Sequence, residues 1–591
     1  MSHTFHIPVL GLGFSIDTPL KVARYGISSV MSVVDDELIE RMREHHSNQK
    51  GQAFIPIKKT ATDYRAKRIT AYLNLVKKLV DEQFENLRNQ PFEAGSDICR
   101  YFELLPNDSQ LKQGYDLMLE YDDGERKRIF KNILRRSITQ GSIDVNIMAK
   151  VDKMNFDADG NYSGDENTDA LAALRGFAES DLQSSVVLSA GMNPKLYSYL
   201  ETFADFFPDH DKQLKKKIIL KVSDFRSAFI QAKFLAKKGL WVSEFRVESG
   251  LNCGGHAFAT EGFLLGPILQ EFKERRTEML IELYALYDTA LITKGIISSK
   301  PPVQRISVQG GIGTAAENEF LKRQYQVDAT GWGSPFLLVP EATNVDDDTL
   351  IKLTGAAESD YYLSNASPLG ILFNNFKHSS SEQQRLARIQ KKRPGSPCTK
   401  KFLCSNTEFT AQPICTASRE YQDLKIKELE KLELLNADRE YAYNTITEKI
   451  CLCEGLCSSA YLKYKINKPK ENTAVAICPG PNLAYFNRTF SLDEMVGHIY
   501  GKLDLLKNIQ RPNIFIKELE LYVDYFQKDM QQHFFTLTDK KRIQLQKFKE
   551  QLLKGINYYT TLFNDMITAP DDIQLELRAF EERLLAQPLL A

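Results

Sequence analysis

The sequence predicts an α/β protein in which residues 1–350 close into a (β/α)8 barrel, followed by a mainly α-helical C-terminal region. Short β-branched runs alternate with longer helical patterns, as they do in parallel βα units. There are eight such runs, which is the number of strands in a closed barrel of this type. Most of the runs are apolar throughout, as expected for strands that are buried on both faces.

The eight predicted strands are bounded by turn residues. They span residues 7–10, 28–33, 143–148, 185–188, 217–222, 244–247, 305–309 and 327–330. An insertion of about residues 48–140 separates the second strand from the third. Residues 64–87 within it carry apolar side chains at helical spacing and predict an amphipathic helix. We expect this helical insertion either on the exterior of the barrel or as a cap over its mouth.

The βα alternation stops after Glu341, and the remaining chain divides into two predicted parts. Residues 351–480 are expected to form an irregular and helical extension that contains most of the cysteines. Residues 481–591 are expected to be a helical region. Apolar spacing in the C-terminal half predicts helices over residues 421–447, 491–509, 516–534 and 539–565.

The overall composition excludes several classes of protein. A chain of 591 residues with 43% hydrophobic and 26% charged residues is an ordinary globular protein, long enough for more than one domain. A net charge of −1 gives no general attraction to nucleic acid or to anionic lipid. The N-terminus does not resemble a signal peptide, and there is no apolar run of about 18 residues. The sequence therefore predicts a soluble cytoplasmic protein without a membrane partner.

Glycine-rich loops follow the last three predicted strands. Residues 248–256 follow the sixth strand, residues 309–314 the seventh and residues 331–335 the eighth. Glycine lets backbone N–H groups approach an anion closely, and the N-terminus of a following helix adds a favourable dipole. Phosphate sites in such barrels typically use the loops after strands seven and eight. A phosphate-bearing ligand is therefore expected at this end of the barrel.

The same loops carry a resemblance to a known family. The matching residues are Val247-Glu248, Gly254-Gly255-His256, Gly310-Gly311-Ile312-Gly313, and the run from Gly333-Ser334-Pro335 to Glu341-Ala342-Thr343. In this order they resemble the nitronate monooxygenases, also called 2-nitropropane dioxygenases, which are FMN-dependent TIM barrels. The similarity covers about residues 5–350, interrupted by the insertion. The C-terminal 240 residues have no counterpart in the simple monooxygenases.

The resemblance implies an FMN-dependent oxidoreductase that binds a small-molecule substrate. It places the FMN phosphate at Gly310, Gly311, Gly313, Gly333 and Ser334, and the flavin near Gly254 and Gly255. Asn146, in the third strand, matches an asparagine that is frequent in the family. His256 matches the catalytic histidine, which exchanges a proton with substrate carbon beside the flavin. Imidazole suits that role because its pKa lies near neutrality.

The C-terminal cysteines form a second candidate site. Cys451, Cys453, Cys457 and Cys478 are soft ligands that an iron–sulfur cluster or zinc prefers. Their spacing matches neither a common ferredoxin pattern nor the Cys-x2-Cys pairs of zinc sites. Buried structural thiols are the alternative interpretation.

A basic stretch over residues 377–401 contains eight lysines and arginines and one acidic residue, Glu382. It is either a solvated surface or a contact for an anionic partner such as a phosphorylated carrier, a nucleotide or RNA. Several functions therefore remain open. The monooxygenase-like enzyme would oxidise an acidic C–H bond or reduce a conjugated C=C bond. The alternatives are an enoyl-thioester reductase, an RNA-modifying flavoenzyme, electron transfer through a cysteine-bound cluster, and a flavin-binding module without turnover.

Overall fold

The computed structural model describes residues 2–147, 152–156, 161–189, 191–298, 300–533, 538–564 and 571–587. Positions 148, 534 and 565, which end three of the predicted elements, lie outside these ranges. Within them, eight parallel strands form a closed barrel in the order β1 to β8. The strands are β1 (Phe5–Ile7), β2 (Ser28–Ser32), β3 (Ile143–Ile147), β4 (Ser185–Leu188), β5 (Lys217–Val222), β6 (Val242–Glu248), β7 (Arg305–Gln309) and β8 (Ala329–Gly331).

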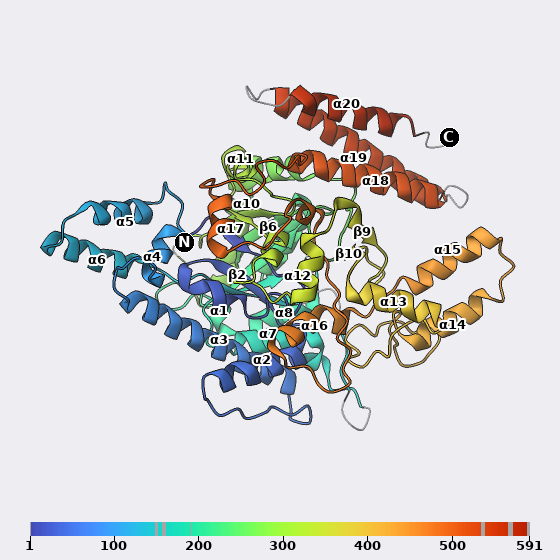
Figure 1. Ribbon diagram of the computed structural model, residues 1–591, viewed down its shortest axis with the longest axis horizontal. Helices are drawn as coiled ribbons and strands as arrows, with labels where there is room; N and C mark the ends of the chain where they lie inside the picture. Colours follow the sequence, from blue (N-terminus) through green and yellow to red (C-terminus); the bar gives the residue numbers. More distant parts are fainter. Residues whose placement is uncertain are drawn as a thin grey trace.

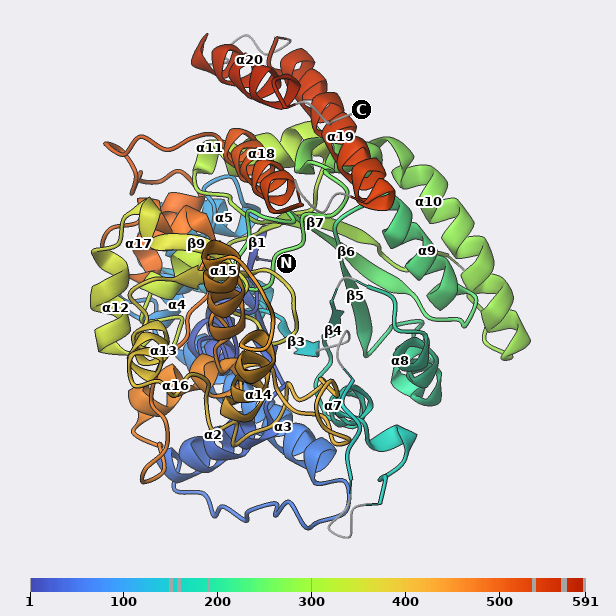
Figure 2. The same ribbon diagram turned by 90° about the vertical axis from the view of Figure 1, so that its right-hand side faces the viewer.

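The barrel is closed by pairing between its first and last strands. His6 of β1 pairs with Ser28 of β2 on one side and with Gly331 of β8 on the other. Helices surround the strands, as Figure 2 shows for α8, α9 and α10 beside β4 to β7. The barrel helices are α1 (Thr18–Val22), α2 (Asp36–Gln49), α7 (Asp169–Ala178), α8 (Pro194–Tyr199), α9 (Phe225–Ala236), α10 (Leu265–Thr293), α11 (Ala315–Tyr325) and α12 (Asp347–Thr354). The predicted (β/α)8 barrel is confirmed.

The insertion between β2 and β3 lies on the exterior of the barrel. It consists of α3 (Tyr64–Asn89), α4 (Asp97–Glu103), α5 (Gln110–Glu120) and α6 (Glu125–Ser137). α3 packs against α7, where Gly176 is so close that an added Cβ would lie 2.7 Å from Ile69. α5 and α6 extend away from the barrel at the left of Figure 1. Of the two positions that the sequence left open, the structure has the exterior one.

The C-terminal region consists mainly of helices that pack against the barrel. Its elements are the hairpin β9 (Tyr361–Ser364) and β10 (Phe373–Phe376), and helices α13 (Ser380–Gln390), α14 (Arg419–Leu429), α15 (Asn436–Thr447), α16 (Leu452–Tyr464), α17 (Leu492–Ile499), α18 (Ile514–His533), α19 (Asp539–Asn564) and α20 (Asp571–Leu585). α14 and α15 form a hairpin at the right of Figure 1, and α18 to α20 form a layer at the top.

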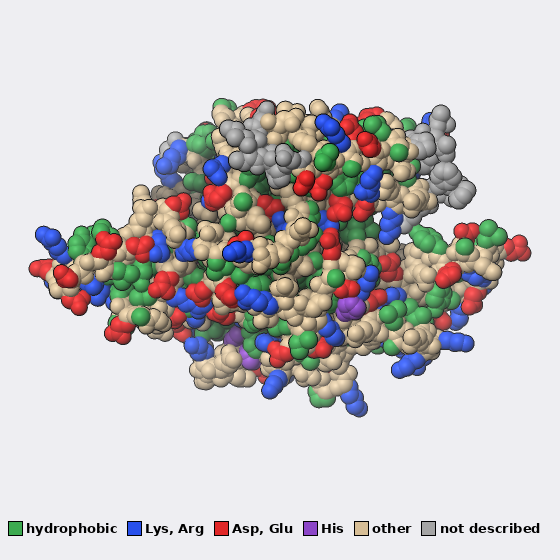
Figure 3. Space-filling model, turned by 45° about the horizontal axis from the view of Figure 1, so that its top comes forward, with side chains coloured by type: hydrophobic (Ala, Val, Ile, Leu, Met, Phe, Trp, Pro, Cys, Tyr) green, Lys and Arg blue, Asp and Glu red, His purple; other side chains and the backbone are tan. Residues whose placement is uncertain are grey.

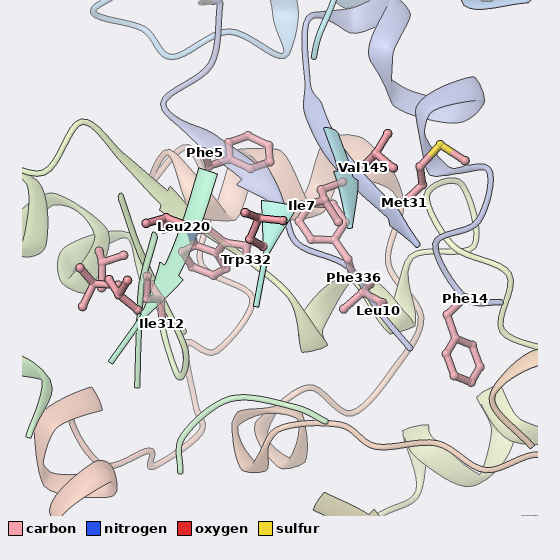
Figure 4. Close-up of a cluster of buried hydrophobic side chains, with 14 of the residues drawn as sticks. Phe5, Ile7, Leu10, Phe14, Met31, Val145, Leu220, Ile312, Trp332 and Phe336 are labelled. Carbon is pink, nitrogen blue, oxygen red and sulfur yellow. The ribbon is translucent and has the colours of Figure 1, made fainter. Parts of the chain in front are cut away.

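One continuous hydrophobic core joins the two regions. Leu10, Ile312, Trp332 and Phe336 of the barrel region, shown in Figure 4, belong to the same buried cluster as Leu483 and Tyr522 of the C-terminal region. These side chains are at most 8% exposed. The C-terminal helices therefore share the core of the barrel.

The surface carries no segregated charge on the face that Figure 3 shows, where cationic and anionic side chains alternate. This matches the net charge of −1. Among the described residues, no helix combines the length and the apolar character needed to cross a bilayer.

Candidate functional site

A cavity of about 300 Å³ opens at the C-terminal ends of the barrel strands. This is the end at which barrels of this type carry their active sites. Its volume lies at the lower end of the range typical of ligand pockets, about 300–1,000 Å³. The wall is built from both regions of the chain. It includes Lys221, Glu248 and Gln309 at the ends of three strands, the loops after β6, β7 and β8, and residues from the segments 369–373 and 477–482.

The loop after β7 presents backbone donors to this cavity. Gly310 and Gly311 have φ values of 108° and 79°, which glycine adopts without strain. Among the described residues, the amide groups of Gly311 and Ile312 donate to no other group. Unpartnered amides at the wall of a cavity suit an anionic ligand such as a phosphate.

Gly313 does not contribute to the phosphate cradle, as we call the free amides of Gly311 and Ile312. Its amide and that of Thr314 donate to the Glu317 side chain, at 2.9 Å and 3.3 Å. Thr314 and Glu317 form a capping box at the start of α11, and Glu317 thereby takes the Gly313 amide that the sequence had assigned to phosphate. Gly313 is also absent from the cavity wall. The structure therefore corrects the prediction for Gly313.

Asn252 supplies an unsatisfied polar atom at the same wall. Its side chain is 1% exposed, and its Oδ1 atom has no hydrogen-bond partner among the described residues. Its Nδ2 atom donates weakly to the Ile514 carbonyl at 3.4 Å. A buried acceptor without a partner is costly, so a ligand that donates to Asn252 would be stabilised here.

His256 follows β6 and is held by the C-terminal region. Its Nε2 atom lies 2.7 Å from the Ser367 hydroxyl, and its ring packs on Phe373 with the ring centres 5.1 Å apart. The Gly255 amide donates to the Cys478 carbonyl at 2.9 Å. An added Cβ on Gly255 would meet nothing within 4 Å, so this side of the loop is open. His256 is thus fixed in direction and borders the cavity.

Three side chains at the strand ends form a polar cluster in the cavity wall. Lys221 Nζ lies 2.8 Å from Glu248 Oε2, and Gln309 donates to Glu248 Oε1 at 2.7 Å. Burial alone lowers the pKa of Lys221, but the Glu248 carboxylate outweighs it, and the pKa of the lysine is raised. Lys221 therefore carries a fixed positive charge beside the cavity.

The four predicted metal-ligating cysteines do not form a ligand set. Cys453 and Cys457 lie within α16, where the Cys457 thiol donates to Asp35 at 3.2 Å. Cys478 lies in the cavity wall beside Gly255, and burial raises its pKa to about 12, so the thiol stays protonated. Within the described parts of the chain, no group of three or more His, Cys, Asp or Glu residues could hold a metal ion. Of the two interpretations of these cysteines, the structure does not support an iron–sulfur cluster or zinc.

The structure brings the other predicted site residues together. Those that line the cavity are Asn146, Gly254, Gly255, His256, Gly310, Gly311, Gly333 and Ser334. Sequence reasoning missed Lys221 and Gln309 as site residues, although each stands at or near the end of a predicted strand. It also missed the wall from the C-terminal region, which includes Leu369, Phe373, Ile477 and Asn482. No local motif marks those positions.

The basic stretch is divided between interior and surface. The Arg385 guanidinium forms an ion pair with Glu382 and donates to the Thr447 carbonyl at 3.2 Å. Lys400 forms a buried ion pair with Asp35, at 2.5 Å. Lys391, Lys392 and Arg393 remain exposed. Only part of the stretch is therefore available to a partner.

Comparison with known proteins gives distant structural matches only. No protein-family model matches the sequence, and neither does any curated protein. Among solved structures, the chain is similar to the enoyl reductase domain of MlnA from the macrolactin biosynthesis cluster of Bacillus amyloliquefaciens. That match has 14% identity and a TM-score of 0.39, and covers 91% of this chain and 97% of the other. FabK from Thermotoga maritima matches with 12% identity and a TM-score of 0.31, over 64% of this chain and 80% of the other. TM-scores this low carry no argument about function.

Proposed function

We propose that the protein is an FMN-dependent oxidoreductase in which His256 exchanges a proton with a substrate carbon atom. The observation that carries the proposal is a single cavity that has free amides of Gly311 and Ile312 at one wall and His256 and Lys221 at others. The glycine loops that resemble the nitronate monooxygenases supply the two amides and His256, and strand β5 supplies Lys221. When bound, FMN would supply the electron-accepting and electron-donating chemistry that protein side chains lack.

The donor set of the cavity fits this cofactor. The amides of Gly311 and Ile312 suit the phosphate, and Ser334 lines the same cavity. Lys221 supplies a positive charge, and Asn252 an unsatisfied acceptor, for the polar edge of an isoalloxazine ring. Gly255 leaves room for a flat ring to approach the backbone. His256, oriented by Ser367, would hold or deliver the proton at the reacting carbon.

The apolar wall of the cavity favours a substrate with a hydrocarbon chain. Leu12, Leu369, Ile371, Phe373 and Ile477 line the cavity, and Phe373 packs on His256. A hydrocarbon chain that entered this part of the cavity would bury these side chains. This observation supports a second candidate within the same class, an FMN-dependent enoyl-thioester reductase.

Identification of the cofactor tests the proposed function directly. We expect purified protein to contain FMN, which denaturation releases for identification by chromatography. Protein without flavin that also fails to bind added FMN would contradict the proposal.

The rate of reoxidation by oxygen separates the two candidates. After anaerobic photoreduction, rapid reoxidation is expected of an oxidase or monooxygenase. Slow reoxidation, together with turnover of an enoyl thioester, is expected of a reductase.

The exposed part of the basic stretch is proposed to contact an anionic partner. Lys392 and Arg393 border a second cavity, of about 850 Å³, together with Arg419 and Lys427. Charge reversal at Lys391, Lys392 and Arg393 is expected to abolish binding of RNA if RNA is that partner. Binding of RNA that survives the reversal would contradict this contact.

We also propose a reducing compartment such as the cytoplasm, which suits the free thiols.

A further inference from the structure

Three side chains that follow residue 480 bind three consecutive carbonyl groups of the loop after β7. Arg511 Nη2 donates to the Gly311 carbonyl at 2.5 Å, and Asn482 Nδ2 donates to the Ile312 carbonyl at 2.8 Å. His498 Nε2 lies 2.8 Å from the Gly313 carbonyl. Burial lowers the pKa of His498, and the Leu505 amide donates to its Nδ1 atom, so the ring is neutral and Nε2 carries the hydrogen. The C-terminal region thus holds the loop through its carbonyl groups and leaves the amides of Gly311 and Ile312 free.

Arg511 connects the members of this arrangement. Besides the Gly311 carbonyl, it donates to Asn482 Oδ1 through Nε at 2.7 Å and to Glu317 Oε1 through Nη1 at 2.6 Å. An added Cβ on Gly313 would lie 2.5 Å from its Nε atom, so the arginine packs directly against the loop. A planar guanidinium offers several donors in fixed directions, which a lysine does not.

Glu317 makes the charge of Arg511 necessary. The Glu317 side chain is 8% exposed and that of Arg511 is 6% exposed, so the pair is nearly free of solvent screening. Glu317 also caps the start of α11, whose N-terminus adjoins the free amides of Gly311 and Ile312. Glu317 accepts from the Gly313 amide, one residue beyond Ile312, so without Arg511 its buried negative charge would repel a phosphate held at the free amides.

We propose that Arg511 is a positioning residue for the cofactor phosphate. It holds the Gly311 carbonyl so that the adjacent amides point into the cavity, and it neutralises Glu317 so that a phosphate dianion is accepted there. This inference rests on the proposed function, because it assumes that the phosphate of FMN occupies the cradle. It assigns to the C-terminal region a direct part in cofactor selection.

Binding of two flavins to the flavin-free protein tests the proposal. FMN and riboflavin share the ring but differ in the phosphate, so a residue that acts on the phosphate affects FMN alone. We expect Arg511→Met to weaken FMN binding at least about tenfold and riboflavin binding much less. Arg583→Met is the matched control, because Arg583 is a partly exposed arginine of α20 paired with Asp524.

A second variant tests whether Arg511 acts by neutralising the charge of Glu317. Glu317→Gln keeps the acceptor of the capping box, since glutamine is accepted at that position, and loses the carboxylate oxygen that accepts from the Ile514 amide. We expect it to bind FMN at least as tightly as the wild type, and the double variant Arg511→Met/Glu317→Gln to recover most of the FMN affinity lost in Arg511→Met. If Arg511→Met does not fold, Arg511→Lys replaces it, with a smaller expected loss of FMN affinity.

Several results would overturn the proposal. One is equal weakening of FMN and riboflavin binding by the arginine variants, which would indicate a structural role only. Others are unchanged FMN affinity in these variants, or no recovery in the double variant. In all of these cases the wild type still binds FMN and the proposed function stands. A wild type that binds neither flavin contradicts the proposed function itself.

Discussion

At the scale of single residues, His256 carries most of the proposed chemistry. It borders the cavity, and its ring is held by Ser367 and Phe373. We expect His256→Asn to lower the turnover number roughly 10²- to 10⁴-fold, the usual contribution of a positioned acid or base. Bound FMN should be retained, because the histidine does not contribute to the phosphate cradle. Steady-state kinetics and the absorbance of bound flavin measure the two effects, and turnover close to that of the wild type would exclude His256 as the acid or base.

Glu518 of α18 is the second residue with a measurable effect. It is 1% exposed, accepts hydrogen bonds from Ser249 at 2.5 Å and from the Leu265 amide at 2.8 Å, and burial raises its pKa to about 7. Because the unfolded carboxyl loses its proton near its ordinary pKa, its contribution to stability is complete below about pH 4.5. The contribution is then lost as the pH rises through about 7.

The variant Glu518→Gln should therefore remove this pH dependence. The neutral amide resembles the protonated acid, so we expect similar stability at pH 4 and a variant more stable than the wild type by up to about 3 kcal/mol at pH 8. Chemical denaturation at the two pH values measures this difference. A wild-type advantage at pH 8 would mean that Glu518 is stabilised as a carboxylate in the folded protein.

At the scale of elements, the loop after β7 depends on a glycine that cannot be replaced. Gly311 has a φ of 79°, and an added Cβ would lie 2.1 Å from Asn252 Nδ2. We expect Gly311→Ala to destabilise the protein by about 1–3 kcal/mol and to lose most of its affinity for FMN. Gly124→Ala is the control, since Gly124 is extended with a φ of 170° and a Cβ there meets nothing within 4 Å. Equal melting temperatures and equal FMN affinities of the two variants would contradict the prediction.

The strands could be predicted from sequence because a strand that is buried in the barrel has apolar residues within its own short run. Six of the eight predicted runs share at least four residues with the observed strand, and the last shares two of the three residues of β8. The first strand begins two residues earlier than predicted, and its His6 pairs with both neighbouring strands. The helices of the C-terminal half were predicted less accurately. Residues 421–447 read as one helix, but the structure has α14 and α15 packed side by side, with no Gly or Pro between them to mark the break. The helix predicted over 491–509 ends at Ile499, near Gly501, whose φ is 70°.

The site could be predicted in part for the same reason. Glycines at strand ends and His256 are local signals, and most of them line the cavity. The prediction for Gly313 failed because its amide donates to Glu317, four positions later. That hydrogen bond depends on the geometry of α11. Arg511 lies 200 positions from Gly311, so only the folded chain brings the two together.

At the scale of the whole molecule, the barrel and the C-terminal region form one buried cluster. The predicted boundaries near residues 350 and 480 therefore do not coincide with gaps in the core. We expect a single cooperative unfolding transition, with the same midpoint by far-UV circular dichroism and by flavin fluorescence. Two separate transitions would indicate that the C-terminal region unfolds on its own.

The contacts of Asn482 and Arg511 with the loop after β7 also bear on the order of events during synthesis of the protein. A ribosome releases the barrel strands well before residues 482–511, at about 5–20 residues per second. Until Arg511 and Asn482 emerge and dock, the carbonyls of Gly311 and Ile312 have no partner to fix them. The nascent barrel would thus reach its eighth strand without a finished phosphate cradle. Loading of the flavin would then be a late event of biogenesis, so that chains interrupted before Arg511 accumulate without cofactor.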